Sequence, residues 1–115
     1  MPFRGIVQKG SEEGRKLGFP TVNIPFDGAL SGTFAGRVRF DEKDYSAAVY
    51  ADARRKILEA HILDIHLDLY GKEIEIELLE KIRDDKVFAD ETEAKATIAT
   101  DVQKVREYLT AASED

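Results

Sequence analysis

A basic segment with evenly spaced glycines, close to the N-terminus, carries residues suited to hold a phosphate. Its three glycines recur at every fourth position of residues 10–18, and backbone without a Cβ lets N–H groups approach a ligand closely. The candidate nucleotide-binding residues are Lys9, Gly10, Gly14, Arg15, Lys16, Gly18, Pro20, Thr21 and Asn23. The segment is not a P-loop, because the P-loop spacing and its Lys-Ser/Thr ending are missing. An ordinary turn-rich loop remains the alternative interpretation.

Thr21 and Asn23, at the end of this segment, are candidate ligands of a divalent cation. They lie two residues apart, so in an extended chain their side chains point to the same side. A hydroxyl and an amide oxygen could help to hold a hydrated Mg²⁺ against the phosphate oxygens of a nucleotide. We therefore predict that Thr21 and Asn23 form a metal site shared with a bound phosphate.

Glu59 is the candidate general base. It lies within the apolar run of residues 57–63, and on a strand it shares one face with Ile57, His61 and Leu63. A carboxylate among apolar neighbours takes up a proton more readily than a solvated one, which suits general-base work. An ion pair with a lysine or arginine at the rim of a sheet is an equally good alternative. For His61 we expect a structural role.

A charged segment at residues 81–88 provides the third set of candidates. Arg83 could meet a phosphate through the two parallel donors of its guanidinium. Phe88 could stack on a ligand or cap a hydrophobic core. The alternative is a solvated turn with one packing phenylalanine.

These candidates must be positioned by several short strands. Residues 73–78 alternate between charged and apolar side chains, as a half-exposed antiparallel strand does. Turn residues stand at 41–44 and around Tyr70-Gly71-Lys72, each between two extended segments. Residues 10–18 and 25–32 are expected to be loops. The expected strands are residues 3–9, 22–24, 33–40, 45–50, 57–65 and 74–82.

The last third of the chain changes to a helical period. One apolar stripe predicts a helix over residues 92–112, with Asp90 or Thr92 as its N-cap. The stripe consists of Ala94, Ile98, Val102, Val105 and Leu109. Five or six antiparallel strands followed by one helix favour a small β-barrel with the helix packed outside. An open sheet with one helix is the competing architecture.

The bulk properties predict a single globular domain over residues 1–115. The chain has no cysteine, which excludes disulfides and suits the cytoplasm. We expect no signal peptide and no membrane association, because no apolar run approaches the length of a membrane span. The net charge of −6 disfavours nucleic-acid binding. Residues 1–40 nevertheless carry six basic and three acidic side chains, which favours a local anion site there.

With these motifs in order along nearly the whole chain, the sequence resembles the bacterial and eukaryotic type of riboflavin kinase. The segment Gly14-Arg15-x-Leu17-Gly18-Phe19-Pro20-Thr21-x-Asn23 is the most specific part of the likeness. Further matching blocks follow it in the same order as in the family. These blocks are Gly32 to Val38, Leu58 to Asp64, Leu69 to Lys72, Ile82 to Phe88, and Ile98-x-x-Asp101.

The resemblance implies a mainly β fold, a six-stranded antiparallel Greek-key β-barrel with a C-terminal α-helix packed outside. It also implies transfer of the ATP γ-phosphate to riboflavin, giving FMN and ADP, with Mg²⁺ or another divalent cation as cofactor. Thr21 and Asn23 would bind the cation and phosphate, and the glycine segment would cover ATP. Glu59 would accept the proton of the ribityl 5′-hydroxyl, and Arg83 and Phe88 would lie at the flavin. We expect a cytoplasmic monomer.

The sequence departs from the family pattern before Glu59. The family has an Asn-Ile-Gly-x-x-Pro segment and a longer loop there, whereas residues 49–56 contain neither Gly nor Pro. A shortened wall is expected to weaken ligand binding, and Arg54-Arg55-Lys56 could offset this or form a solvated charge run. Many bacterial relatives also carry an adenylyltransferase domain, which we do not find in this sequence. We therefore expect this domain to make FMN and no FAD. A binding module that has lost catalysis is the alternative function.

Overall fold

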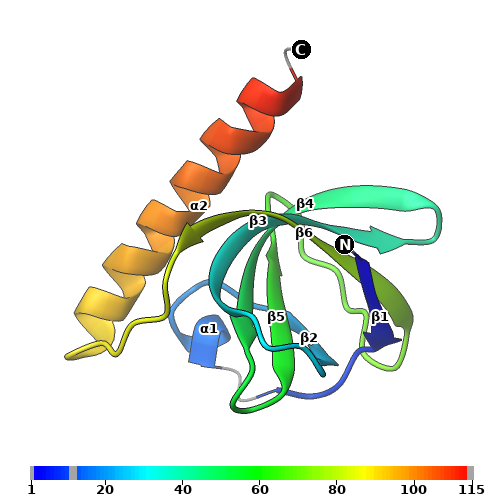
Figure 1. The fold of residues 1–115 in the computed structure, drawn as a ribbon, viewed down its shortest axis with the longest axis horizontal. Coiled ribbons are helices and arrows are strands. Elements are labelled where there is room, and N and C mark those ends of the chain that lie inside the picture. The colour runs from blue at the N-terminus through cyan, green and yellow to red at the C-terminus, as the bar shows by residue number, and fades with distance from the viewer. Residues whose placement is uncertain (1, 11–12, 114–115) are drawn as a thin grey trace.

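The computed structural model describes residues 2–10 and 13–113 as a β-barrel with a long helix along one side (Figure 1). Six strands build the barrel, and a short helix lies between the first two. The strands are β1 (Pro2–Ile6), β2 (Val22–Pro25), β3 (Ser31–Phe40), β4 (Lys43–Asp52), β5 (Ile57–Ile62) and β6 (Glu73–Arg83). The helices are α1 (Glu13–Lys16) and α2 (Glu91–Ser113). The predicted mainly β fold is confirmed.

All strand pairs are antiparallel, in the order β1-β6-β3-β4-β5-β2. Strands β3, β4 and β5 follow one another, and β6 then returns to pair with β3, which is the Greek-key arrangement. The barrel closes where the chain leaves β1. The Val7 N–H donates to the Lys72 carbonyl at 2.9 Å, and the next N–H, from Gln8, donates to the Asn23 carbonyl at 2.8 Å.

This change of partner explains why β1 is shorter than predicted. Residues 3–9 were expected to form one strand, but the ladder with β6 ends at Ile6. Strand β5 is also shorter than the predicted 57–65 and ends at Ile62. Asp64 adopts a φ of 66°, which turns the backbone out of the sheet. The loop expected at residues 10–18 contains the single turn of α1.

The β3–β4 hairpin is tighter than the sequence predicts. Residues 41–44 were expected to form the turn, but only Asp41 and Glu42 lie outside the two strands. Both residues have positive φ, at 53° and 64°, as the central residues of a type I′ turn do. This turn type matches the right-handed twist of the strands, so pairing continues to Phe40 and Lys43.

The barrel core follows the alternation of side chains along the strands. On β5, Leu58 and Ala60 are fully buried and Ile62 nearly so, whereas Glu59 and His61 on the other face are half-buried. Full burial of a large aliphatic side chain contributes about 1.5–3 kcal/mol. The largest fully buried side chains of the described residues are Ile24, Leu58, Ile74, Ile76, Val38, Val49 and Val105.

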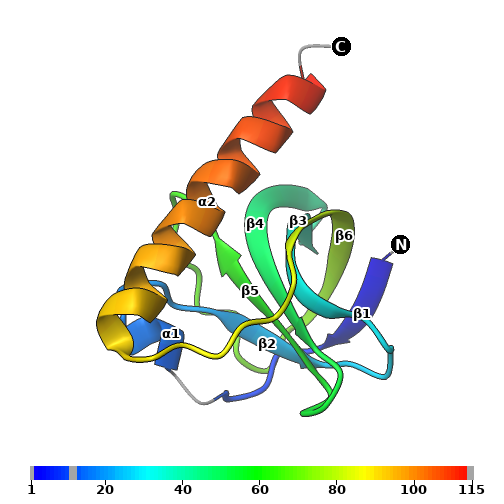
Figure 2. The same cartoon turned by 60° about the vertical axis from the view of Figure 1, so that its left-hand side comes forward.

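Helix α2 packs its apolar stripe against the outside of the barrel. Val105 and Leu109 join Ala35 of β3 and Leu63 in a second apolar cluster. Of the two predicted N-caps, Asp90 is the one observed, since its carboxylate accepts the Glu93 N–H at 2.9 Å. Both views show the C-terminal turns of the helix extending beyond the barrel (Figures 1 and 2).

An exposed ion pair also ties α2 to the end of β5. The two terminal nitrogens of Arg106 each donate to one Asp64 oxygen at 2.6 Å. The hydrogen bond from Arg106 holds the pKa of Asp64 below its usual value. None of the helices in the described part of the chain is long and apolar enough to span a membrane.

The close approach of β3 and β6 at Gly36 generates a stability prediction. A Cβ at this position would lie 2.4 Å from the Glu77 carbonyl oxygen and 2.9 Å from a Val49 methyl. We expect Gly36→Ala to lower the free energy of unfolding by about 1–3 kcal/mol, as overpacking does. Urea denaturation measures this, with the exposed substitution Ser46→Ala on the paired strand as the control. Equal urea midpoints for the two variants would contradict the predicted clash at Gly36.

Candidate active site

A pocket of about 300 Å³ lies on the outer face of the barrel, beside the first turns of α2. Its floor is the half-buried outer face of β4 and β5. The segment between β6 and α2 borders it, running across the barrel to the start of the helix (Figure 2). Aromatic side chains from four parts of the chain line its walls: Phe19, Tyr50, His61 and Phe88.

One row of paired residues crosses five strands at this pocket. Across neighbouring strands, Arg83 pairs with Thr33, Thr33 with Tyr50, Tyr50 with Glu59, and Glu59 with Asn23. Directly opposite residues of an antiparallel pair point to the same face, with Cβ atoms about 4.5–5.5 Å apart. The barrel register therefore gathers one cation, one carboxylate and three neutral polar groups on a single stripe of the outer face.

A second pocket, of about 240 Å³, lies beside the first on the N-terminal segment. Thr21 lines both pockets, so the two spaces have this residue in common. Gly10 packs directly on Asn23, because a Cβ there would lie 2.2 Å from the Asn23 amide nitrogen. The predicted nucleotide-binding residues that line this pocket are Lys9, Gly10, Arg15, Pro20, Thr21 and Asn23.

Three residues of the predicted nucleotide set lie elsewhere. Gly14 is part of α1. Lys16 and Gly18 are exposed and are not among the described residues that line the two pockets. Gly18 has a φ of 91°, and its N–H donates to the Arg15 carbonyl at 3.1 Å. A glycine at this position therefore allows the backbone turn that follows α1.

The pair predicted to bind a cation lies at the N-terminal pocket, and its Thr21 lines the aromatic pocket as well. The Thr21 hydroxyl donates to the Asn23 side-chain oxygen at 3.3 Å, and Asn23 is only 5% exposed. Two neutral oxygens suit a hard cation such as Mg²⁺, which usually keeps waters and substrate phosphates as its other ligands. Among residues 2–10 and 13–113, no group of three or more acidic or histidine side chains forms a complete metal site. The donor set thus fits a cation shared with a phosphate.

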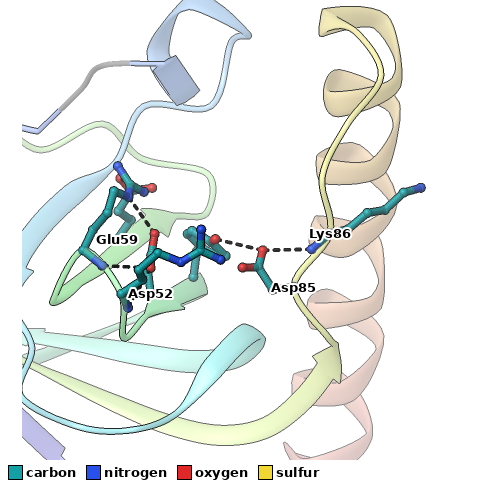
Figure 3. A network of polar contacts seen from close by, with 7 residues as sticks. Asp52, Glu59, Asp85 and Lys86 are labelled. Atoms are coloured by element: carbon teal, nitrogen blue, oxygen red, sulfur yellow. Dashed lines mark hydrogen bonds and ion pairs between the residues drawn. The ribbon is translucent and has the colours of Figure 1, made fainter.

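Glu59 belongs to a polar network that runs from the β4–β5 turn (Figure 3). The Arg55 guanidinium contacts Glu59 Oε1 at 3.4 Å and Asp52 Oδ2 at 2.6 Å. Partial burial pushes the pKa of Asp52 upward, but hydrogen bonds from Arg55 outweigh burial, so the net pKa lies below its usual value. The ion pair considered for Glu59 from sequence is therefore present, and Glu59 lines the aromatic pocket as well.

His61 makes contacts of the structural kind that we expected, and this residue also lines the aromatic pocket. Its Nδ1 lies 2.8 Å from the Pro20 carbonyl oxygen, which can only accept, so this nitrogen carries the proton. The His61 ring also meets Phe19 edge to face, with ring centroids 5.4 Å apart. These contacts hold the segment leading to Thr21 against β5.

Arg83 and Phe88 both line the aromatic pocket, but the Arg83 guanidinium is already engaged. Its Nε donates to both oxygens of Asp101 on α2, at 2.9 and 3.0 Å, and one terminal nitrogen donates to the Asp84 carbonyl at 3.0 Å. The guanidinium carbon lies 5.6 Å from the centre of the Phe88 ring. Arg83 thus connects β6, α2 and the intervening segment at the pocket.

Several pocket residues were not among the sequence candidates. Tyr50 belongs to an apolar strand, and its hydroxyl donates to Asp85 Oδ1 at 2.8 Å across 35 residues of sequence. The Lys86 N–H donates to the same oxygen at 2.8 Å (Figure 3). The identity of Arg55 as the partner of Glu59, and the role of Asp52 beside it, were also missed. The only available signal was the charged composition of residues 52–56, which is equally typical of a solvated turn.

The chain is thus a small β-barrel with an outer helix, in which a basic, glycine-containing segment adjoins an aromatic pocket. The model of the flavokinase family, described as riboflavin kinase, matches residues 1–109, so this chain belongs to the riboflavin kinase family. The chain is 39% identical over 115 residues to the bifunctional riboflavin kinase/FMN adenylyltransferase of Escherichia coli K12. That match covers 91% of this chain and 37% of that protein.

One solved structure agrees with this assignment, and a second shares the fold. The riboflavin kinase of Trypanosoma brucei is similar at a TM-score of 0.66 and 26% identity, over 95% of this chain and 79% of that one. A macrolide-efflux protein from Streptococcus pneumoniae has a TM-score of 0.79 at 24% identity, over 91% of this chain and 38% of that one. The second likeness concerns the fold alone. The chain thus spans just over a third of the length of its bifunctional relatives.

The environment of Tyr50 generates a prediction about alkaline stability. Burial, and then the hydrogen bond and charge of Asp85, raise the pKa of Tyr50 above its usual value of about 10. The folded state therefore holds this proton more tightly than the unfolded state. The resulting stabilisation is fully present below pH 10 and declines as the pH rises further.

We expect wild type to lose more free energy of unfolding between pH 9 and about pH 11 than Tyr50→Phe does. Chemical denaturation across this range measures the difference, and tyrosinate absorbance should show one late-titrating residue that the variant lacks. Tyr70→Phe is the matched control, since Tyr70 is exposed. Parallel pH profiles for wild type and Tyr50→Phe would contradict the burial of this hydroxyl.

Proposed function

We propose that this domain transfers the γ-phosphate of ATP to the ribityl 5′-hydroxyl of riboflavin, giving FMN and ADP. The observation that carries the proposal is the position of Thr21, which lines both the aromatic pocket and the basic N-terminal pocket. Glu59 lines the aromatic pocket on the strand next to Asn23. Two substrates bound in these pockets would meet at these side chains. Membership of the riboflavin kinase family supports the same reaction.

The aromatic pocket is the proposed riboflavin site. A flavin presents a flat, largely apolar ring system, and rings such as those of Phe88, Tyr50 and Phe19 offer surfaces on which it can stack. We assign Arg83 and Phe88 to the flavin side. Because Asp101 and Asp84 hold the Arg83 guanidinium, Arg83 acts there mainly by keeping Phe88 and the neighbouring segment in place.

The N-terminal pocket is the proposed ATP site. Lys9 and Arg15 bring positive charge to this pocket, and Gly10 lets the backbone come close to Asn23. Thr21 and Asn23 would hold Mg²⁺ or another divalent cation, which neutralises charge on the transferring phosphate. Phosphoryl transfer depends mostly on such positioning and neutralisation. The remaining predicted nucleotide residues, Gly14, Lys16 and Gly18, would act through the backbone conformation of this segment or its charge.

Glu59 is the proposed general base. Its carboxylate would accept the proton of the ribityl hydroxyl as that oxygen attacks the γ-phosphorus. The absence of cysteine agrees with a cytoplasmic location, which completes the proposal. We also propose that the domain acts as a monomer.

The reaction is tested by incubating the protein with riboflavin, ATP and Mg²⁺ and measuring FMN by chromatography. We expect FMN to form, and we expect Glu59→Gln to lower kcat about 10²–10⁴-fold, the usual contribution of a positioned base. Glu80→Gln, an exposed carboxylate on β6, is the matched control and should leave kcat unchanged. Binding of riboflavin and ATP without any FMN formation would support the non-catalytic binding module instead.

The metal assignment has its own test. Thr21→Ala and Asn23→Ala should each raise the Kd for Mg·ATP about tenfold, the effect of losing roughly 1.4 kcal/mol of polar interaction. Riboflavin affinity should change much less, and Thr110→Ala, exposed near the end of α2, should change neither. Titration calorimetry with each ligand separates these effects. A loss confined to riboflavin affinity would show that Thr21 and Asn23 do not hold the cation.

A further inference from the structure

The β4–β5 turn places a guanidinium between two carboxylates at the edge of the aromatic pocket. Arg55 Nε lies 2.6 Å from Asp52 Oδ2, and Arg55 Nη2 lies 3.4 Å from Glu59 Oε1. Both carboxylate side chains are largely shielded, at 13% and 17% exposure, whereas the arginine side chain is 48% exposed. Asp52, Arg55 and Glu59 therefore form a chain of alternating charge from the turn to the pocket; Figure 3 labels the two carboxylates at its ends.

The backbone of the turn holds this arrangement in place. Asp52 Oδ1 accepts the N–H groups of both Arg54 and Arg55 at 3.1 Å, so the first carboxylate is held on both of its oxygens. Lys56 then adopts a φ of 57°, and its carbonyl accepts the Phe26 N–H at 2.9 Å. Strand β5 begins at the next residue. The turn is thus a well-connected support rather than a solvated charge run.

The contacts of Arg55 favour a role toward Glu59 over direct phosphate binding. Bidentate phosphate recognition needs two parallel guanidinium donors, and in Arg55 one donor already points to Asp52 and another to Glu59. Charged groups that line the same pocket from other elements are Arg83, Asp85, Lys86 and Asp101. Arg83 is bonded to Asp101, and Asp85 is bonded to Tyr50. Arg55 is therefore a cation of this pocket that contacts Glu59 through a described ion pair.

We propose that Arg55, supported by Asp52, is a positioning residue that orients the Glu59 carboxylate for proton abstraction. This inference rests on the proposed function, in which Glu59 is the base. A glutamate side chain has several rotatable bonds, and an ion pair with a fixed partner restricts the positions of its carboxylate. Misplacement of a reacting group by about 1 Å can lower a rate 10²-fold. Loss of Arg55 should therefore affect turnover more than substrate binding.

The test is a double-mutant cycle between Arg55 and Glu59, followed as FMN formation. We expect Arg55→Gln to lower kcat about 10–100-fold while the KM values for Mg·ATP and riboflavin change less than about threefold. In the Glu59→Gln background, the same substitution should change kcat less than about twofold, because the group that it positions is already lost. Arg55→Lys should recover part of kcat, since one ammonium can contact only part of the pair.

Arg54→Gln is the matched control. The substitution removes the same charge from the same turn. It changes only an exposed side chain, so the hydrogen bond from the Arg54 backbone N–H to Asp52 stays in place. Its kcat should equal that of wild type. Melting curves verify that all variants are folded. A tenfold rise in KM for Mg·ATP with unchanged kcat in Arg55→Gln would overturn the proposal and assign Arg55 to phosphate binding. The proposal would also be overturned if Arg55→Gln lowered kcat by the same factor in wild type and in the Glu59→Gln background.

A spectroscopic measurement keeps this inference separate from the reaction itself. Wild-type protein that makes no FMN would refute the proposed function without deciding the role of Arg55. The carboxyl ¹³C resonance of Glu59, assigned by its loss in Glu59→Gln, reports its ion pair directly. It should shift in Arg55→Gln and stay in place in Arg54→Gln. An unshifted resonance in Arg55→Gln would overturn the positioning role whatever the activity.

Discussion

The alternation of side chains along β5 is the constraint on which the rest of the structure depends. Its inward residues, such as Leu58 and Ala60, are fully buried in the barrel core. Burial of these residues leaves Glu59 and His61 on the outer face, because successive side chains of a strand point to opposite sides. A slip of one residue would bury the carboxylate and expose the leucine. The core therefore determines the direction of the proposed base.

The outer face becomes a pocket only because other elements are brought over it. The pair between Arg83 and Asp101 joins β6 to α2, and both side chains are at least four-fifths shielded from solvent. Removing one partner of such a pair is costly, because the other charge remains poorly solvated. Asp85 adds a bond from the connecting segment to Tyr50 on β4. The strand face, the segment and the helix are thus held together by polar contacts around the space that they enclose.

The short β4–β5 turn alters the interpretation of the departure from the family pattern. The sequence suggested a missing wall with three positive charges that were solvated or faced a ligand. In the structure all three side chains are exposed, but Arg55 is also bound between two carboxylates. One of the three charges is therefore part of the pocket. The shortened β4–β5 turn carries a chain of ion pairs that ends on Glu59. The length of the turn alone therefore does not describe how it shapes the pocket.

Sequence by itself determined the mainly β class of fold, most strand positions, the helix with its apolar stripe, and the residues that share a strand face with Glu59. Each follows from local periodicity, and the motif between Gly14 and Asn23 indicated the family. The tertiary structure decided which polar groups meet. Tyr50 reaches Asp85 across 35 residues, and Arg83 reaches Asp101 across 18. Such partners depend on strand register and helix docking, which are properties of the packed barrel and leave no local periodic pattern in the chain.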